Sequence, residues 1–465
     1  MNKFITILLW VLLFLLVSIV GLFLFSFTHT GNEILKPYVQ EKLEHEIGLP
    51  VEVKKFTLES GTSSLDMLIN KQAVAHVVAQ YDLWSQSFEG TYHVKADTFT
   101  HESRKLKNVD IQGSFKGNSE DIFMEGKGSA FNAKLDYRFN IINDVPQKIV
   151  VNMQGAEFAE VLEYLGHPAL VEGKIDIDID MPDMGEDTAS GYGHIVLNKS
   201  SFNRTLVKEL YDYTLPEKSY LTGTLDAKLE GQDIKLVGNV QSNLFTLQIK
   251  DANVDMVSDH LSAEYSLDVK DMRILSKNKL AGLLKVDGKV EKMDKVTHVV
   301  GTSHSLGGTL EFTVDESSKI TLDKLYLEKL LPFFKQPDYA KGQLSGTINL
   351  DNVKLKTGIY DIQIDKGVLK TKALEKMSRY KIPIENRFTL KSKGKISDTV
   401  LTGDLKLDST LTDISLSSLA YDLKQKSLLS DYDILIHDVN AVMHKAQVAK
   451  GTPVSAKGVL KFKDK

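Results

Sequence analysis

The sequence contains no cysteine among its 465 residues. This absence excludes a disulfide scaffold and any thiolate metal site, and it fits a compartment in which free thiols would be oxidised. A strong net charge is also missing, because the formal value is only −5, and nothing in it favours nucleic acid as a partner. Beyond the N-terminal segment there are no long apolar runs of the kind found in buried parallel strands. A doubly wound α/β enzyme core is therefore not expected.

One apolar stretch does occur, at the start of the chain. From Phe4 to Phe27 there is no charged residue, and the helix that this length predicts would be about 36 Å long, enough to cross a bilayer. No small-residue cleavage site follows, so residues 1–30 are predicted to be an uncleaved transmembrane anchor. Lys3 and the amino terminus favour a cytoplasmic N-terminus with the bulk of the chain on the other side of the membrane.

A short helix is predicted directly after the anchor, within residues 31–50. Leu35, Val39, Leu43 and Ile47 recur at four-residue steps, and Gly48 and Pro50 provide a stop. This amphipathic juxtamembrane helix is expected to dock on whatever follows it.

The remaining region, residues 51–465, has the alternation of β-strands. In the segment GKIDIDIDMP, Asp176, Asp178 and Asp180 alternate with isoleucines. A calcium loop would need a glycine where Met181 stands, and the intervening residues would not be β-branched. The segment is therefore predicted to be a strand with a wet face and an apolar face.

Many other segments alternate in the same way, as in antiparallel sheets with one wet side. FTLQIK, GIYDIQIDKG and LTGDLKLDS are examples, and about 25 strands are expected in all. Seven glycines at irregular spacing are predicted to open such strands. These are Gly113, Gly173, Gly223, Gly288, Gly346, Gly403 and Gly458. Three short helical stretches precede some of them: AEFAEVLEYLGHP, FNRTLVKELYDYTLP and LDKLYLEKLLPFFKQP. This recurring unit indicates an extended array of similar units, with no linker that divides it.

The layout resembles a known family. A single N-terminal anchor runs into ILKPYVQEKLEHEIGLPVEVKKFTLE, and YLEKLLPFFKQPDYAKGQLSGTINLDN and LVEGKIDIDID follow later. These patterns resemble the AsmA-like family of bacterial envelope proteins, which is related to bridge-like lipid-transfer proteins. The resemblance implies an inner-membrane anchor followed by an elongated, curved, mostly antiparallel sheet in the periplasm, which forms a groove with an apolar interior. It also implies a role in lipid transport or outer-membrane homeostasis, with phospholipid or another acyl lipid, the inner membrane and possible envelope proteins as partners.

The apolar face of such a sheet must be buried against another layer, close on itself, or meet a ligand. If it is a lipid groove, its lining consists of ordinary aliphatic residues. The candidates are Ile175, Ile177, Ile179, Leu225, Leu247, Ile249, Ile362, Ile364, Leu405 and Leu407. A packed sandwich remains an alternative for the fold. For function, the alternative is an anchored structural or assembly factor that binds client proteins through its sheet surface or edge.

No enzymatic site is predicted. SHSLGG, around Ser305, nearly matches the nucleophile elbow of α/β-hydrolases, but Ser303 stands where that turn needs glycine. The residues that follow alternate as a strand instead of forming the required helix, so a polar turn is expected there. The histidines show no metal-binding spacing, and neither a cofactor nor a metal is predicted.

Overall fold

The computed structural model describes residues 25–101, 104–143, 145–185, 188–258, 260–275, 280–293, 296–352, 356–371, 385–439, 449 and 451–463. Nearly all of the predicted anchor, residues 1–30, lies outside this part of the chain. Among the helices that are described, none combines the length and the apolar character needed to span a bilayer.

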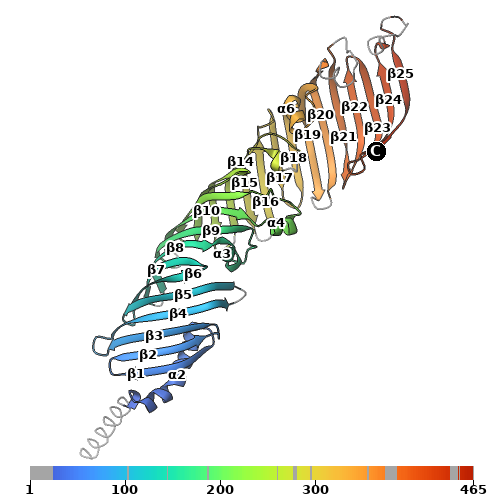
Figure 1. Cartoon of the computed structure of the whole chain (residues 1–465). Coiled ribbons are helices and arrows are strands. Elements are labelled where there is room, and N and C mark those ends of the chain that lie inside the picture. Colours follow the sequence, from blue (N-terminus) through green and yellow to red (C-terminus); the bar gives the residue numbers. More distant parts are fainter. Residues whose placement is uncertain are drawn as a thin grey trace, which may run out of the picture. The chain divides into compact units, whose positions relative to one another are not determined.

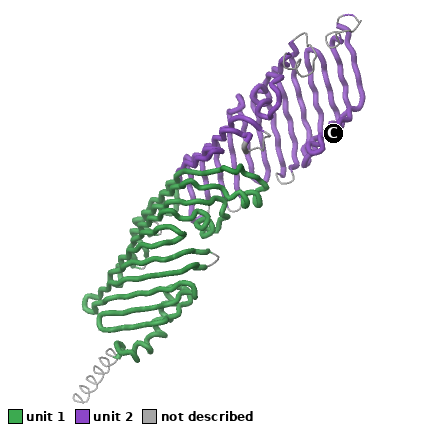
Figure 2. The backbone as a smooth tube through the Cα atoms, in the orientation of Figure 1, with its two compact units in different colours: residues 1–235 green, residues 236–465 purple. Residues whose placement is uncertain are grey.

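The protein is mainly β, as predicted: 67% of residues are in strands and only 12% in helices. Its 25 strands are assigned to one antiparallel sheet, which also agrees with the expected number (Figure 1). The chain forms two compact units, residues 1–235 and residues 236–465 (Figure 2).

Unit 1 is a meander in which each strand from β1 to β11 pairs antiparallel with the next strand in sequence. Its helices are α2 (His29–Ile47), α3 (Phe158–Tyr164) and α4 (Arg204–Tyr211). Its strands are β1 (Val51–Glu59), β2 (Thr62–Ile69), β3 (Ala73–Asp82), β4 (Ser87–His101), β5 (Arg104–Gly117), β6 (Asp121–Ala130), β7 (Ala133–Ile142), β8 (Val145–Glu157), β9 (Val171–Asp183), β10 (Ser190–Phe202) and β11 (Tyr220–Glu230).

Unit 2 repeats this sequential pairing from β13 to β25, and β12 (Asp233–Ser242) contains the boundary between the units. Its helices are α5 (Met272–Leu275) and α6 (Leu327–Phe333). Its strands are β13 (Phe245–Asp255), β14 (His260–Val269), β15 (Leu284–Met293), β16 (Val296–Ser303), β17 (Thr309–Val314), β18 (Ser318–Tyr326), β19 (Ala340–Asn352), β20 (Thr357–Leu369), β21 (Arg387–Ser397), β22 (Val400–Ser409), β23 (Thr412–Asp422), β24 (Ser427–Ile436) and β25 (Val454–Lys463).

Helix α2 overlaps the helix predicted within residues 31–50, and it covers the outer edge of β1. Its N-cap is Thr28, and Gly48 ends it in the left-handed conformation, with φ of 69°. The side-chain amide of Asn32 accepts a hydrogen bond from the Leu58 N–H (2.9 Å) and donates one to the Leu58 carbonyl (3.2 Å). The side chains of Gln40 and Glu44 accept hydrogen bonds from two more backbone N–H groups of β1, each at 3.1 Å. These bonds satisfy backbone groups that an edge strand would otherwise offer to another chain.

Two details of the predicted repeat differ from the structure. The segment LDKLYLEKLLPFFKQP is helical only from Leu327, because Leu322, Leu325 and Tyr326 belong to β18 and pair with β19. The glycines expected to open strands lie inside them instead, as Gly113 in β5 and Gly288 in β15 do. Their positions are set by cross-strand neighbours, which are described below.

Tightly packed core is confined to strips where helices and chain turns cover the sheet. In unit 1, Ala130, Ala133, Ala156 and Ile175 form one such cluster, and α3 packs on it through Phe158, Val161 and Tyr164. Leu43 of α2 packs on a second cluster around Val51 and Val53. In unit 2, residues of α6 contribute to two further clusters. In the part of the chain that the structure describes, the helices therefore bury only part of the apolar side of the sheet in each unit.

Candidate functional site

One face of the unit 1 sheet is apolar across all eleven strands. The strand registers connect one residue from each strand into a row across the unit. We define the central row of unit 1 as Phe56, Leu65, Val77, Tyr92, Gly113, Gly126, Tyr137, Val151, Ile179, Gly193 and Ala227. The neighbouring row is Val53, Met67, Ala75, Val94, Ile111, Gly128, Leu135, Met153, Ile177, Ile195 and Leu225. Neither row contains a charged residue.

Unit 2 has an apolar face built in the same way. Its central row runs from β13 to β22 and consists of Ile249, Tyr265, Gly288, Gly301, Phe312, Ile320, Ile348, Tyr360, Gly394 and Gly403. A further row on this face is Leu344, Ile364, Leu390, Leu407, Ile414, Ile434 and Ala456. Charged side chains are absent from both of these rows as well.

The side chains of the two central rows are half-buried. Every residue of the unit 1 row is intermediate in exposure, and so is every residue of the unit 2 row except the buried Gly301. In a packed sandwich, a second sheet would bury such side chains as completely as Ile175, which is 1% exposed under α3. Within the described residues of each unit, the apolar face is therefore only partly covered.

All ten residues predicted to line a groove lie on these faces. Ile175, Ile177, Ile179 and Leu225 share the apolar face of unit 1. The other six share that of unit 2, namely Leu247, Ile249, Ile362, Ile364, Leu405 and Leu407. Ile175 is the exception in burial, because α3 and β8 enclose it.

Four strands of unit 1 carry a feature that sequence reasoning missed. Tyr92 on β4 lies over Gly113 on β5, and Tyr137 on β7 lies over Gly126 on β6, where a Cβ would come within 2.6 Å of the tyrosine hydroxyl in each case. Gly113 and Gly126 are themselves register partners, so the two hydroxyls meet and form a hydrogen bond. We call this arrangement the tyrosine bridge. Of these residues the sequence pattern singles out Gly113 alone, and Gly126 and both aromatic partners are identified only from the strand register.

The opposite face of each unit is polar and carries many ion pairs between neighbouring strands. Asp178 and Asp180 are exposed there, whereas Asp176 accepts hydrogen bonds from the Gly155 N–H (2.8 Å) and the Asn198 amide (2.6 Å). The carboxylates of GKIDIDIDMP thus form the wet side of strand β9, as predicted. Lys391, Lys393 and Lys395 are the exposed equivalents on β21. Among the described residues, no group of acidic and histidine side chains has the arrangement of a metal site.

The cavities of the structure border mainly polar-face residues. One of about 810 Å³ lies over β3 to β8 and is bordered by polar-face residues such as His76, His93, Lys127 and Arg138. The four residues of the tyrosine bridge, Tyr92, Gly113, Gly126 and Tyr137, border it as well. None of the ten predicted lining residues borders it.

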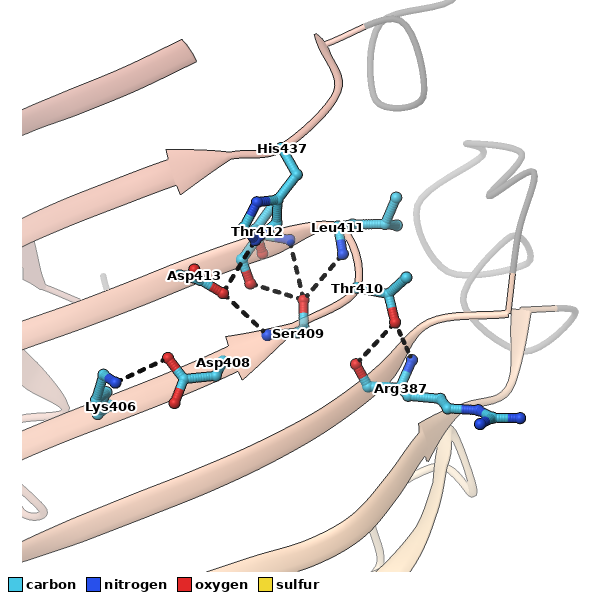
Figure 3. A network of polar contacts seen from close by, with 9 residues as sticks. All are labelled: Arg387, Lys406, Asp408, Ser409, Thr410, Leu411, Thr412, Asp413 and His437. Atoms are coloured by element: carbon cyan, nitrogen blue, oxygen red, sulfur yellow. Dashed lines mark hydrogen bonds and ion pairs between the residues drawn. The ribbon is translucent and has the colours of Figure 1, made fainter. Parts of the chain in front are cut away.

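A second cavity, of about 690 Å³, lies beside the β22–β23 turn in unit 2. Figure 3 shows the polar contacts of this turn. Ser409 organises this turn, because its hydroxyl donates to the Thr412 carbonyl at 2.7 Å and its N–H donates to Asp413. Burial disfavours ionisation of Asp413, but His437, at 3.1 Å, and the Ser409 N–H together hold the pKa of that carboxyl below its usual range. Asp413 pairs with His437, Asp408 with Lys406 and Arg387 with Glu385, and these pairs indicate a structural network.

Ser305 lies in a turn between β16 and β17, as the sequence predicts. Its hydroxyl oxygen accepts a hydrogen bond from the Lys285 N–H at 2.8 Å, so the side chain ties this turn to the start of β15. A strand follows where a hydrolase elbow requires a helix.

Comparison with protein-family models, with curated proteins and with solved structures finds no match for this chain.

Proposed function

We propose that this protein is a membrane-anchored lipid-transfer protein whose apolar sheet faces form a groove that shields acyl chains. The observation that carries the proposal is the pair of central rows, which are free of charge from strand to strand and yet only half-buried. An apolar surface of this extent that is only partly covered, as it is among the described residues, is typical of a binding surface. The resemblance to the AsmA-like family supports the same function.

The physical benefit of such a face is large. Each methylene group exposed to water costs about 0.8 kcal/mol, so a sixteen-carbon chain that leaves a membrane unaided faces a barrier of about 12 kcal/mol. A charge-free face removes most of this barrier without catalysis. It also needs no single specific site, which agrees with a lining of ordinary aliphatic residues.

The proposed location is the inner membrane, with the N-terminus in the cytoplasm and the sheet in the periplasm. The support is the uncharged segment from Phe4 to Phe27 and the position of Lys3 before it. A reporter that works only in the periplasm, fused at Lys465, is expected to be active. Activity of a reporter that works only in the cytoplasm would reverse the orientation.

Two adjacent residues of β9 allow a matched test of the groove. Ile177 lies on the apolar face and Asp178 on the polar face of the same strand. In the full chain, a photo-crosslinking residue at 177 is expected to capture lipid, and one at 178 is expected to capture none. Equal labelling at both positions, or at neither, would contradict the groove.

Substitution of the same two residues separates an open face from a packed core. Ile177→Asp places a charge in the path of an acyl chain, which costs several kcal/mol when the charge is buried unpaired, so captured lipid is expected to fall sharply. In an open face the variant folds, because water solvates the new carboxylate when lipid is absent. Asp178→Asn is the control and should stay within about 0.5 kcal/mol of the parent protein in stability. An unfolded Ile177→Asp variant, together with a parent protein that carries no lipid, would favour a packed core.

A second candidate function is the binding of client proteins at a sheet edge. Helix α2 occupies the edge of β1, so a client strand could not pair there without displacing it. Among the described residues β25 pairs with β24 alone, and Val459 (67%) and Phe462 (56%) are exposed on it. Crosslinking from β25 to protein, with no lipid captured at residue 177, would favour this function.

A further inference from the structure

The hydroxyls of the tyrosine bridge introduce hydrogen-bonding capacity into a face that otherwise has very little. In the central row of unit 1, the only side-chain polar atoms are those of Tyr92 and Tyr137. Both rings are half-buried and lie among other aromatic side chains. Phe115 is 6.4 Å from Tyr92 and Phe139 is 6.2 Å from Tyr137, measured between ring centroids.

The bridge leaves one proton without a good acceptor. Each tyrosine hydroxyl can donate one hydrogen bond, and the hydrogen bond between the two hydroxyls uses one of the two protons. The remaining contact is from the Tyr92 hydroxyl to the Glu125 carbonyl at 3.4 Å, longer than an ordinary O–H···O bond. Among the described residues, the pair thus has capacity to donate one further hydrogen bond at full strength.

Unit 2 shows that covering the glycines does not require this arrangement. Tyr265 lies over Gly288 in the same way, and its hydroxyl donates to the backbone carbonyl of Val300 at 3.2 Å. In the same central row of unit 2, the register partner of Gly301 is Phe312, which lies over Gly301 and has no hydroxyl. One tyrosine and one phenylalanine therefore suffice to cover a pair of glycines.

We propose that the tyrosine bridge is a binding subsite for the ester carbonyl of an acyl lipid, with the attached chain lying along the apolar face of unit 1. This inference rests on the proposed lipid-binding function. A neutral acceptor fits the apolar side of the bridge, because the central row and the neighbouring row of unit 1 contain no Lys or Arg to neutralise a phosphate, and Lys127 and Arg138 lie on the polar face. Burial raises the pKa of both hydroxyls, so both remain protonated donors. An ester carbonyl is the neutral acceptor that is covalently attached to an acyl chain.

The test compares two lipids that differ only at the ester. Val151 is the register partner of Tyr137, and the full chain is prepared with a photo-crosslinking residue at position 151. It is offered an equal mixture of diester and diether phosphatidylcholines with identical chains and headgroup. The parent protein is expected to capture the diester about fivefold more than the diether, the ratio given by one hydrogen bond of about 1 kcal/mol. In Tyr92→Phe/Tyr137→Phe the ratio should fall to about one, with diether capture unchanged.

Tyr265→Phe in unit 2 is the control, and it should leave the ratio at position 151 unchanged. Infrared spectroscopy of a diester labelled with ¹³C at the carbonyl gives a second readout that does not depend on yield. Its carbonyl band should lie at lower wavenumber in the parent protein than in the double variant.

Equal capture of both lipids by the parent protein would overturn the ester subsite and leave the groove standing. A preference that persists in the double variant would do the same. Capture of neither lipid would overturn the groove and the subsite together.

Discussion

The two units cover a pair of glycines in their apolar faces with different aromatic side chains. Each central row contains a pair of adjacent glycines covered by an aromatic ring from the flanking strand on either side, Gly113 and Gly126 in unit 1 and Gly288 and Gly301 in unit 2. Unit 1 uses two tyrosines, Tyr92 and Tyr137, whereas unit 2 uses Tyr265 and Phe312. Both units therefore place an aromatic ring over each glycine of such a pair, and the second hydroxyl is specific to unit 1.

This comparison separates the roles of ring and hydroxyl. A glycine inside a strand weakens it, because it contributes no side chain to pack and has high backbone entropy when unfolded. An aromatic ring laid over it restores packing, as cross-strand aromatic residues do for glycines in designed sheets. Because Phe312 performs this task without a hydroxyl, the hydroxyl pair of unit 1 requires another explanation, which the ester subsite provides.

The largest effect is expected from filling the space under a ring. Gly126→Ala places a Cβ within 2.6 Å of the Tyr137 hydroxyl and 2.8 Å of the Gln112 carbonyl, so unit 1 should lose about 1–3 kcal/mol of stability from overpacking. Gly288→Ala should have a comparable effect in unit 2. Hydrogen exchange measured by mass spectrometry over β4–β7 and β14–β17 reports each unit separately.

The matched control is Gly193→Ala in the same central row, where the new Cβ meets only the Ala227 Cβ, at 3.6 Å. Its stability should change by less than about 0.5 kcal/mol. Equal losses at Gly126 and Gly193 would show that the rings do not constrain the glycines.

The second effect is a dependence on alkaline pH. Burial raises the pKa values of Tyr92 and Tyr137 above those of the unfolded chain. The free energy that the two protonated hydroxyls contribute to folding is therefore fully present below the unfolded pKa of about 10, and it is lost as pH rises above that value. Each group contributes at most about 1.4 kcal/mol per pH unit, and less in practice because solvent screens half-exposed rings. Between pH 9 and pH 11, the thermal unfolding temperature should fall less steeply with rising pH in Tyr92→Phe/Tyr137→Phe than in the parent protein. If the unfolding temperature depended on pH equally in both proteins, that result would argue against two buried hydroxyls.

A smaller effect is expected when unit 1 is given the aromatic residues of unit 2. Tyr137→Phe removes the hydrogen bond between the hydroxyls and keeps the ring over Gly126, so the loss should be about 0.5–1.5 kcal/mol. Faster hydrogen exchange confined to β4–β7 would agree with this. A loss as large as that of Gly126→Ala would mean that the hydroxyl, and not the ring, holds the strands together.

The smallest effect belongs to the reciprocal change, Phe312→Tyr. The hydroxyl of Tyr265 already has an acceptor in the Val300 carbonyl, so a second hydroxyl should change stability by less than about 0.5 kcal/mol. Its informative readout is lipid capture beside Phe312. A gain in preference for diester over diether there would show that the hydroxyl pair alone is enough to make the subsite.

The sequence by itself determined which residues share a face. Alternation has a period of two in a strand, so the wet aspartates and apolar isoleucines of β9, and the ten predicted lining residues, follow from local pattern alone. Helix α2 was likewise readable from its four-residue spacing and its terminal Gly48, because both signals are local. Ser305 could be placed in a turn for the same reason.

Only the tertiary structure decided what each face meets. Tyr92 and Tyr137 are 45 residues apart, and their hydroxyls meet only because the registers of four strands align them over two glycines. The place where each helix docks likewise decides which side chains are buried under α3 and α6 and which rows beside them stay half-buried. Periodicity assigns a side chain to a face, but the burial of that face depends on long-range packing that the alternation of single strands does not encode.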